Sequence, residues 1–437
     1  MSSHRTTGQE PGATISTNVM DPHPNTLYDL LRRQGNSKPE QTALVSGSCN
    51  MSYMDLLREV EVRAYQLQSL GVHRGDRIGI HLRKSPEEVI ATFAIASLGA
   101  VFVNINYQWT SFQLRHVIND CAISVLVTDS RKTRQLNDML RDDLLQTVIA
   151  TDLTESRGGI EAWTSCIDTP ENWRSYNPIS SDLAALLYTS GSTGSPKGVM
   201  VTHCNVLDGA RVVSEYLGLM SSDRLLSVPP FNFDYGLNQL TGSVWVGATL
   251  ILQSTTLPVE ILRSVQTYEA TVLPLVAPSW VQVLRVLMDE AMPLPSLRIA
   301  TNTGGKIPGN LLRHVAGLLP GVSFFLMYGL TEAFRSTYLP PALFEEKLGA
   351  IGIAVPDNEI FVIDHKKGIC GPDETGELVH RGSFVSRGYW GKPELTDERI
   401  KPNKHLRDII GDEPVVHSGD LVRIDKDGIC RFIGRCD

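Results

Sequence analysis

The sequence lacks several features that would place it in a membrane, nucleic-acid or redox class. Its longest apolar stretch, Val89–Ile105, is interrupted by small and polar residues and falls short of the ~20 residues that span a bilayer. The seven cysteines include no C-x-x-C pair and no zinc-like grouping with histidine, which is typical of separate, reduced thiols. A net charge of −8, without a block of lysine, arginine and aromatic residues, argues against a nucleic-acid partner.

A secretory signal is also missing. Residues 1–25 are rich in serine, threonine, glycine and proline without an apolar core, so we expect a flexible tail there. With neither a signal nor a membrane span, a cytoplasmic location is the expectation. The remaining residues exceed what one hydrophobic core usually supports, which predicts two or three compact units.

Apolar runs alternate with helical patterns over residues 26–180, the first predicted subdomain. Two predicted strands, Arg77–Leu82 and Val101–Ile105, flank a helix that opens at Ser85-Pro86. Serine suits the N-cap and proline the first helical position. A second helix, Ser111–Asp120, leads to a further strand, as successive βαβ units require.

The alternation resumes over residues 181–354, the second predicted subdomain, after a candidate linker over 172–182. After Ala354 short strands separated by turn signals replace it, and they predict a small β subdomain over 355–437. The predicted fold class is therefore α/β, with two mixed, mainly parallel sheets flanked by helices, plus a small antiparallel β-barrel.

The most informative segment leaves a strand and reads T-S-G-S-T-G-S-P-K-G from Thr189 to Gly198. Glycines let backbone N–H groups approach phosphate oxygens, hydroxyls add donors, and Lys197 adds positive charge. It is not a Walker A loop, because Pro196 precedes the lysine and Gly198 follows it; nor does Ser190 permit a G-x-S-x-G elbow. Taken alone, it could equally be a flexible Ser/Gly connection.

Together with four later segments, this loop resembles the adenylate-forming superfamily of acyl-CoA synthetases, luciferases and peptide-synthetase adenylation domains. The resemblance covers residues 25–437. The four segments, in chain order, are N-T-G-G-K at 302–306, Y-G-L-T-E at 328–332, G-E-L…R-G…G-Y at 376–389, and S-G-D…G-R-C-D at 418–437.

The resemblance implies a role for each matching residue. Lys197, Thr331 and Glu332 would act in catalysis, with Thr331 at the α-phosphate and Glu332 holding Mg²⁺ together with Thr189. Tyr328 would stack on adenine, and Asp420, with Arg435 nearby, would bind the ribose. The backbone of Gly304 and Gly305 would face the base, and the phosphates would lie in a loop formed by Thr189, Ser190, Gly191, Ser192, Thr193, Gly194 and Lys197.

Milder interpretations exist for single residues. Glu332 could be a carboxylate at a helix N-terminus and Asp420 a turn residue, while Tyr389 and Trp390 are expected to pack in the core. A purely regulatory nucleotide-binding module remains a distant alternative. A dinucleotide reductase is excluded, because the first strand–helix junction reads R-K-S-P rather than G-x-G-x-x-G.

The function implied by the resemblance is ATP-dependent activation of a carboxylic acid to its acyl-AMP. A thiol, either CoA or the phosphopantetheine of an acyl carrier protein, would then accept the acyl group. Family members continue beyond the G-R-x-D hinge into a further domain that carries a catalytic lysine. This sequence stops at Asp437, so we expect that C-terminal domain to be absent.

The acid would bind near Asp234, with Tyr235, Asn238 and Thr303 as further candidates. Asp234 matches the position at which amino-acid-activating relatives bind the substrate ammonium, although it could equally be a solvated or capping aspartate. The surrounding residues look most like acyl-AMP ligases associated with bacterial exosortase systems. The acid itself stays unidentified at this point.

Overall fold

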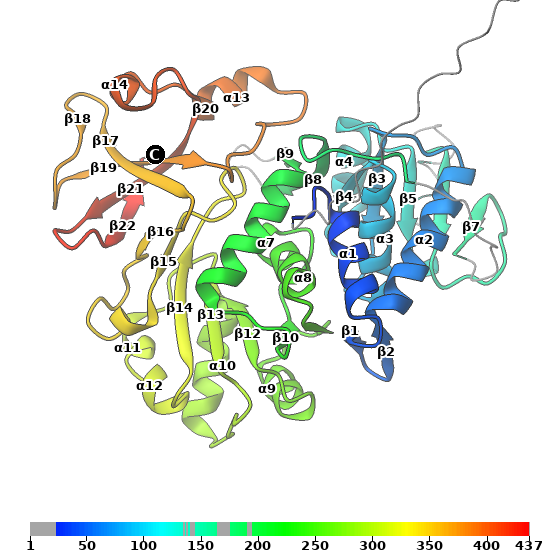
Figure 1. Cartoon of the computed structure of the whole chain (residues 1–437), viewed down its shortest axis with the longest axis horizontal. Helices are drawn as coiled ribbons and strands as arrows, with labels where there is room; N and C mark the ends of the chain where they lie inside the picture. The colour runs from blue at the N-terminus through cyan, green and yellow to red at the C-terminus, as the bar shows by residue number, and fades with distance from the viewer. Residues whose placement is uncertain are drawn as a thin grey trace, which may run out of the picture.

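The computed structural model describes residues 23–133, 136, 139, 145–163, 175–189 and 195–436. Two mainly parallel sheets lie side by side with helices between and around them, and a curled antiparallel sheet follows at one end of the molecule (Figure 1). The predicted fold class is confirmed.

The first sheet has seven strands, and only its last pair is antiparallel. Helix α3 (Pro86–Ser97) joins two of its central strands and begins as predicted, because the Ser85 side chain accepts a hydrogen bond from the Glu88 backbone N–H. In spatial order the strands are β7 (Ile160–Ala162), β6 (Thr147–Ala150), β5 (Val125–Thr128), β3 (Arg77–His81), β4 (Val101–Asn104), β8 (Leu183–Thr189) and β9 (Lys197–Thr202).

The second sheet has nine strands, parallel from β14 to β1 and antiparallel at both edges. In spatial order they are β16 (Ile353–Ala354), β15 (Thr337–Leu339), β14 (Ser323–Tyr328), β13 (Ile299–Thr303), β12 (Val272–Val276), β10 (Arg224–Ser227), β11 (Thr249–Leu252), β1 (Thr42–Ser46) and β2 (Cys49–Ser52). The expected boundary at residue 181 does not separate the two sheets. Strands β1 and β2 belong to the second sheet, whereas β8 and β9 complete the first.

Five helices share one apolar core that lies between the two sheets. They are α1 (Leu27–Ser37), α2 (Tyr53–Ser69), α3, α7 (His203–Leu217) and α8 (Asp234–Val246). The other helical segments are α4 (Ser111–Asp120), α5 (Ser130–Thr133), α9 (Pro258–Thr267), α10 (Ala277–Asp289), α11 (Gly309–Leu312), α12 (Val315–Leu318), the 3₁₀ turn η2 (Pro341–Leu343), α13 (Pro393–Arg399) and α14 (Arg407–Ile410). Among the described helices, none is both long and apolar enough to cross a membrane.

The curled antiparallel sheet is the small β subdomain predicted after Ala354. Its strands are β18 (Gly368–Ile369), β17 (Asn358–Asp364), β19 (Thr375–Gly382), β21 (Val415–Ile424) and β20 (Ile400–Lys401), with β22 (Cys430–Arg435) paired to β21. Strands β21 and β22 carry Asp420 and Arg435 in register with each other. The curled sheet thereby brings these two predicted site residues to the carboxyl end of β14, which lies about ninety residues earlier in the sequence.

Candidate active site

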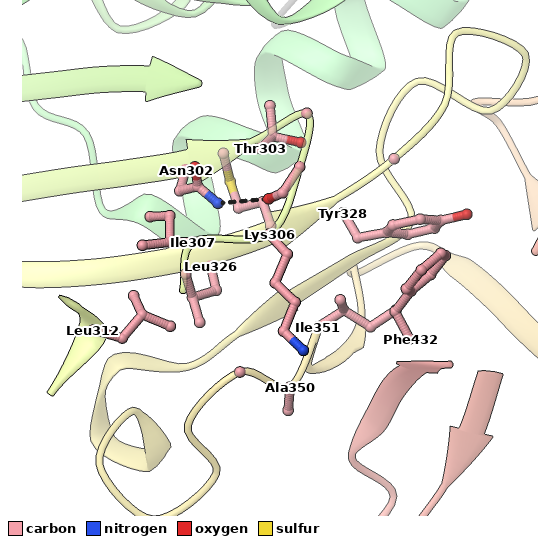
Figure 2. A pocket seen from close by; sticks show the side chains of 15 residues that line it. Asn302, Thr303, Lys306, Ile307, Leu312, Leu326, Tyr328, Ala350, Ile351 and Phe432 are labelled. Atoms are coloured by element: carbon pink, nitrogen blue, oxygen red, sulfur yellow. Dashed lines mark hydrogen bonds between the residues drawn. The ribbon is translucent and has the colours of Figure 1, made fainter. Parts of the chain in front are cut away.

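A cavity of about 260 Å³ lies at the carboxyl ends of β13 and β14, with Phe432 of β22 in its wall (Figure 2). Gly304 and Gly305 form its turn with φ angles of 70° and 148°, a region that side chains disfavour. The ring of Tyr328 faces that of Phe432, with centroids 6.5 Å apart. Backbone on one side and aromatic rings on the other form a slot suited to a flat heterocycle such as adenine.

The hydroxyl of Tyr328 connects this cavity to the curled sheet. It donates a hydrogen bond to Asp420 Oδ2, and Arg435 Nη1 donates to Asp420 Oδ1 at 2.8 Å. Burial, followed by the negative charge of Asp420, raises the pKa of Tyr328, so its hydroxyl stays protonated and is the donor. The structure thus brings together three residues that the sequence assigned to the adenosine part of ATP.

Next to this slot lies a groove of about 680 Å³. Thr189 and Lys197 face each other across the β8–β9 pair at its edge. Ser190, Gly191, Ser192, Thr193 and Gly194, the centre of the expected phosphate loop, lie outside the described residues. The groove is lined by side chains from the β8–β9 pair, the segment after β14, helix α13 and the curled sheet, among them Thr189, Lys197, Thr331, Glu332, Tyr389, Arg399, Lys401, Asp420 and Arg435. Several cations converge there, as binding of a polyphosphate requires.

Glu332 has a fixed orientation within the groove. The hydroxyl of Tyr389 donates to Glu332 Oε1 at 2.5 Å, and the backbone N–H of Ser386 donates to the Glu332 carbonyl at 2.9 Å. Burial and the adjacent Glu332 charge raise the pKa of Tyr389, which keeps this hydroxyl a donor. The Nζ atom of Lys197 lies 6.0 Å from the centroid of the same ring. Tyr389, expected only to pack, therefore contacts two of the three predicted catalytic residues.

The donor set of the groove fits Mg²⁺ in its chemistry. Thr189 and Glu332, the predicted metal ligands, both line it and both offer oxygen atoms. Across the described ranges no group of three or more histidine, cysteine, aspartate or glutamate side chains is placed to hold a metal. A Mg²⁺ ion here would therefore take its remaining ligands from phosphate oxygens and water, which is the usual arrangement for this cation.

Asp234, expected to face the acid, begins helix α8 and has a partner within the protein. Arg335 Nη1 donates to Asp234 Oδ2 at 2.6 Å, and the two side chains are 1% and 2% exposed. Burial raises the pKa of Asp234, and the charge of Arg335 opposes that shift.

The backbone explains how Arg335 becomes buried only three residues after Glu332. Phe334 has a left-handed φ of 51°, which is unfavourable for a bulky residue. Its ring is held in the interior against Phe384, with centroids 6.0 Å apart. This turn directs Glu332 into the groove and Arg335 into the core.

The other predicted acid-site residues are divided between two cavities. Tyr235 and Asn238 line a buried cavity of about 20 Å³, room for little more than one water molecule. The Tyr235 hydroxyl is hydrogen bonded to Thr301, 2.5 Å from its Oγ1. Thr303 lies instead in the wall of the larger nucleotide cavity.

Sequence reasoning missed Arg335, Tyr389 as a hydrogen-bond donor, and Phe432. A signal existed for Arg335, since it is a lone cation in an apolar stretch that directly follows Thr331-Glu332. No comparable signal marks Phe432, because its place beside Tyr328 depends on the pairing of β21 with β22.

Comparison with known proteins identifies the family of this chain. The family model described as AMP-binding enzyme matches residues 31–390. Bacitracin synthase 3 of Bacillus licheniformis is 28% identical over 427 residues, 96% of this chain but 6% of that protein. Gramicidin S synthase 2 of Aneurinibacillus migulanus is 26% identical over 96% of this chain and 9% of its own length. The chain thus spans less than a tenth of these curated relatives.

Among solved structures, the o-succinylbenzoate coenzyme A synthetase of Bacillus subtilis in complex with AMP has a TM-score of 0.79 and 26% identity. The match covers 94% of this chain and 79% of that one.

Proposed function

The chain belongs to the AMP-binding enzyme family, and from this premise we propose that it binds ATP·Mg²⁺ and a carboxylic acid and joins them as an acyl-AMP, releasing pyrophosphate. The acid oxygen attacks the α-phosphorus, and the bond from that phosphorus to the pyrophosphate oxygen breaks. The mixed anhydride formed is then open to attack by a thiol. We propose CoA or a carrier-protein phosphopantetheine as that thiol.

One observation carries the proposal: the adenine-sized slot and the groove that holds Lys197 and Glu332 adjoin at Tyr328 and Asp420. A nucleotide whose base lies in the slot would place its ribose at Asp420. Its phosphates would then extend towards Thr331, Glu332 and Lys197. Positive charge along that path offsets the negative charge that accumulates when two anions are brought together.

Each residue has a distinct part in this chemistry. Lys197 would neutralise phosphate oxygens as a point charge, and Thr331 would donate its hydroxyl to the α-phosphate. Glu332, held by Tyr389, would bind Mg²⁺. Bound Mg²⁺ would supply charge neutralisation at the phosphates. Transfer of the acyl group to the thiol would follow this step.

Calorimetric titration of the 437-residue chain with AMP, and with ATP in the presence and absence of Mg²⁺, tests the proposal. Asp420→Ala should weaken the binding of both nucleotides. Glu332→Gln should weaken ATP binding only when Mg²⁺ is present. Glu215→Gln, a surface carboxylate at the end of α7 that is 55% exposed, is the matched control and should change neither. Failure of AMP to bind, or loss of binding in the control, would refute the proposal.

A further inference from the structure

The buried ion pair between Asp234 and Arg335 lies where the sequence predicted that the acid would bind. Asp234 lies at the start of α8, next to Tyr235 and near Asn238, which line the small cavity. The guanidinium of Arg335 lies 5.0 Å from the centroid of the Tyr235 ring and 2.6 Å from the Asp234 carboxylate. The position at which the family resemblance places a substrate ammonium is thus already filled by a cation of the protein.

A second cation would gain little binding free energy beside Asp234. Arginine is charged at all accessible pH values, so the Asp234 carboxylate is neutralised before any ligand arrives. Of the two carboxylate oxygens of Asp234, Oδ2 accepts from Arg335 and Oδ1 has no hydrogen-bond partner among the described residues. An ammonium at that oxygen would make two buried cations share one carboxylate, and like charges at short range in a poorly solvated site repel strongly.

We propose that Arg335 is a built-in counter-ion that excludes an α-ammonium, so that the chain selects carboxylic acids without an α-amino group. This inference rests on the proposed function, because it concerns the acid that the same site would activate. It makes Arg335 a specificity-determining residue. It also gives Asp234 a structural role: the carboxylate neutralises Arg335 in the interior.

The pair is held in place from both sides. Arg335 Nη1 also donates to the Phe334 carbonyl at 2.7 Å, so the guanidinium is tied to the left-handed turn after Glu332. Its Nε and Nη2 atoms have no hydrogen-bond partner among the described residues. These N–H groups favour an oxygen acceptor nearby and oppose any further donor, which an ammonium would be.

The test uses acyl sulfamates of adenosine, non-hydrolysable analogues of acyl-AMP, in two matched pairs. Propanoyl is compared with alanyl, and 4-methylpentanoyl with leucyl, so that each pair differs only in the α-amino group. Calorimetry on the 437-residue chain should give at least about tenfold tighter binding of the deaminated member, a difference of ~1.4 kcal/mol. Arg335→Met should abolish or reverse that ratio.

Two further variants make the result decisive. The double variant Asp234→Asn with Arg335→Met removes both charges, so it can be tested if Arg335→Met alone does not fold. It should bind the deaminated and the amino member of each pair with similar affinity. Arg298→Met breaks the partly buried Arg298–Asp223 pair elsewhere and should leave the ratio of the wild type unchanged.

Two outcomes separate the two proposals. If AMP and adenosine sulfamate bind, but the amino members bind as tightly as or more tightly than their partners, the inference about Arg335 is overturned and the proposed function stands. If neither AMP nor adenosine sulfamate binds, the proposed function fails and the inference fails with it.

Discussion

The charged side chains on the nucleotide side and on the acid side of the candidate site differ in their exposure to solvent. On the nucleotide side Lys197 and Glu332 are partly exposed and line a groove of about 680 Å³. On the acid side Asp234 and Arg335 are at most 2% exposed and pair with each other in the interior. Water screens the first set, whereas only the partner charge compensates each member of the second.

This difference indicates what each set contributes. Charged groups facing an open groove add little to folding stability and are available to a ligand. A buried pair makes the fold depend on both partners and leaves little charge for a ligand to pair with. We therefore expect substitutions on the nucleotide side to affect binding, and those on the acid side to affect stability and substrate choice.

The largest effect is expected from breaking the buried pair. Arg335→Ala leaves Asp234 as an uncompensated charge in the interior and should lower the free energy of unfolding by about 3–5 kcal/mol. Asp234→Asn combined with Arg335→Met should lose much less, because no charge is then left unpaired. Urea unfolding of the two variants measures both. A loss under about 1 kcal/mol in Arg335→Ala would show that the pair is not a stability element, and the comparison would fail.

A smaller effect is expected from protonation of the closed interior. His203, fully buried at the start of α7, accepts a hydrogen bond from the Leu27 backbone N–H at 3.2 Å, and burial lowers its pKa to about 4. The folded pKa lies below the unfolded value of about 6.5, so the unfolded chain binds more protons between these values. Stability is then full above pH ~6.5 and falls by roughly 2–3 kcal/mol as the pH drops towards 4.

The measurement is thermal or urea unfolding between about pH 7.5 and 4 in the wild type and in His203→Gln. Glutamine keeps a hydrogen-bonding side chain but does not titrate, so the variant should show a shallower loss of stability with acidity. Parallel curves for the two proteins would exclude His203 as a source of the dependence.

The sequence predicted the order of elements well, because local patterns determine it. Helix α4 begins and ends at Ser111 and Asp120 as expected, and α3 begins at Pro86 after the predicted N-cap Ser85. Assignment of strands to sheets was less accurate. Pairing of β1 with β11, more than two hundred residues away, leaves no signal in a single apolar run.

The site shows the same division between local and long-range information. Residues in contiguous motifs, such as Thr331 and Glu332, line the groove as expected. The partner of Asp234 was not predicted, because Arg335 lies 101 positions away and reaches it only through the left-handed turn at Phe334. Charge patterns along a chain do not show which charges will meet in the interior.

A still smaller effect is expected where Tyr389 holds Glu332. Tyr389→Phe removes the hydroxyl that donates to Glu332 Oε1 but keeps the buried ring beside Lys197. A hydrogen bond to a charged group contributes about 1.5–3 kcal/mol, and part of it should appear as an increase of roughly fivefold in the Mg²⁺ concentration needed for tight ATP binding. Tyr28→Phe removes a similar tyrosine–glutamate bond, to Glu61 at 2.8 Å, far from the groove and should not change the Mg²⁺ dependence. Equal Mg²⁺ dependence in wild type and Tyr389→Phe would reduce Tyr389 to a packing residue.

The smallest effect on stability is expected at Lys197, the charged group at the edge of the open groove. Its side chain is only partly buried, and its Nζ atom lies 6.0 Å from the centroid of the Tyr389 ring. A cation–π contact at that distance is weak, so Lys197→Ala should change the free energy of unfolding by no more than about 0.5 kcal/mol.

The same substitution should nevertheless weaken ATP binding far more than AMP binding, since ATP carries the additional phosphates that extend along the groove. Lys197→Arg is the matched variant: it keeps the charge and should retain most of the difference between the two nucleotides, because a point charge rather than a particular geometry is what the phosphates require. Calorimetry with AMP and ATP, together with urea unfolding of each variant, separates the two roles. If Lys197→Ala lowered stability by several kcal/mol and weakened both nucleotides equally, Lys197 would support the β8–β9 pair itself. The stability of the fold would then depend on a charged residue on the nucleotide side, as it is expected to do on the acid side.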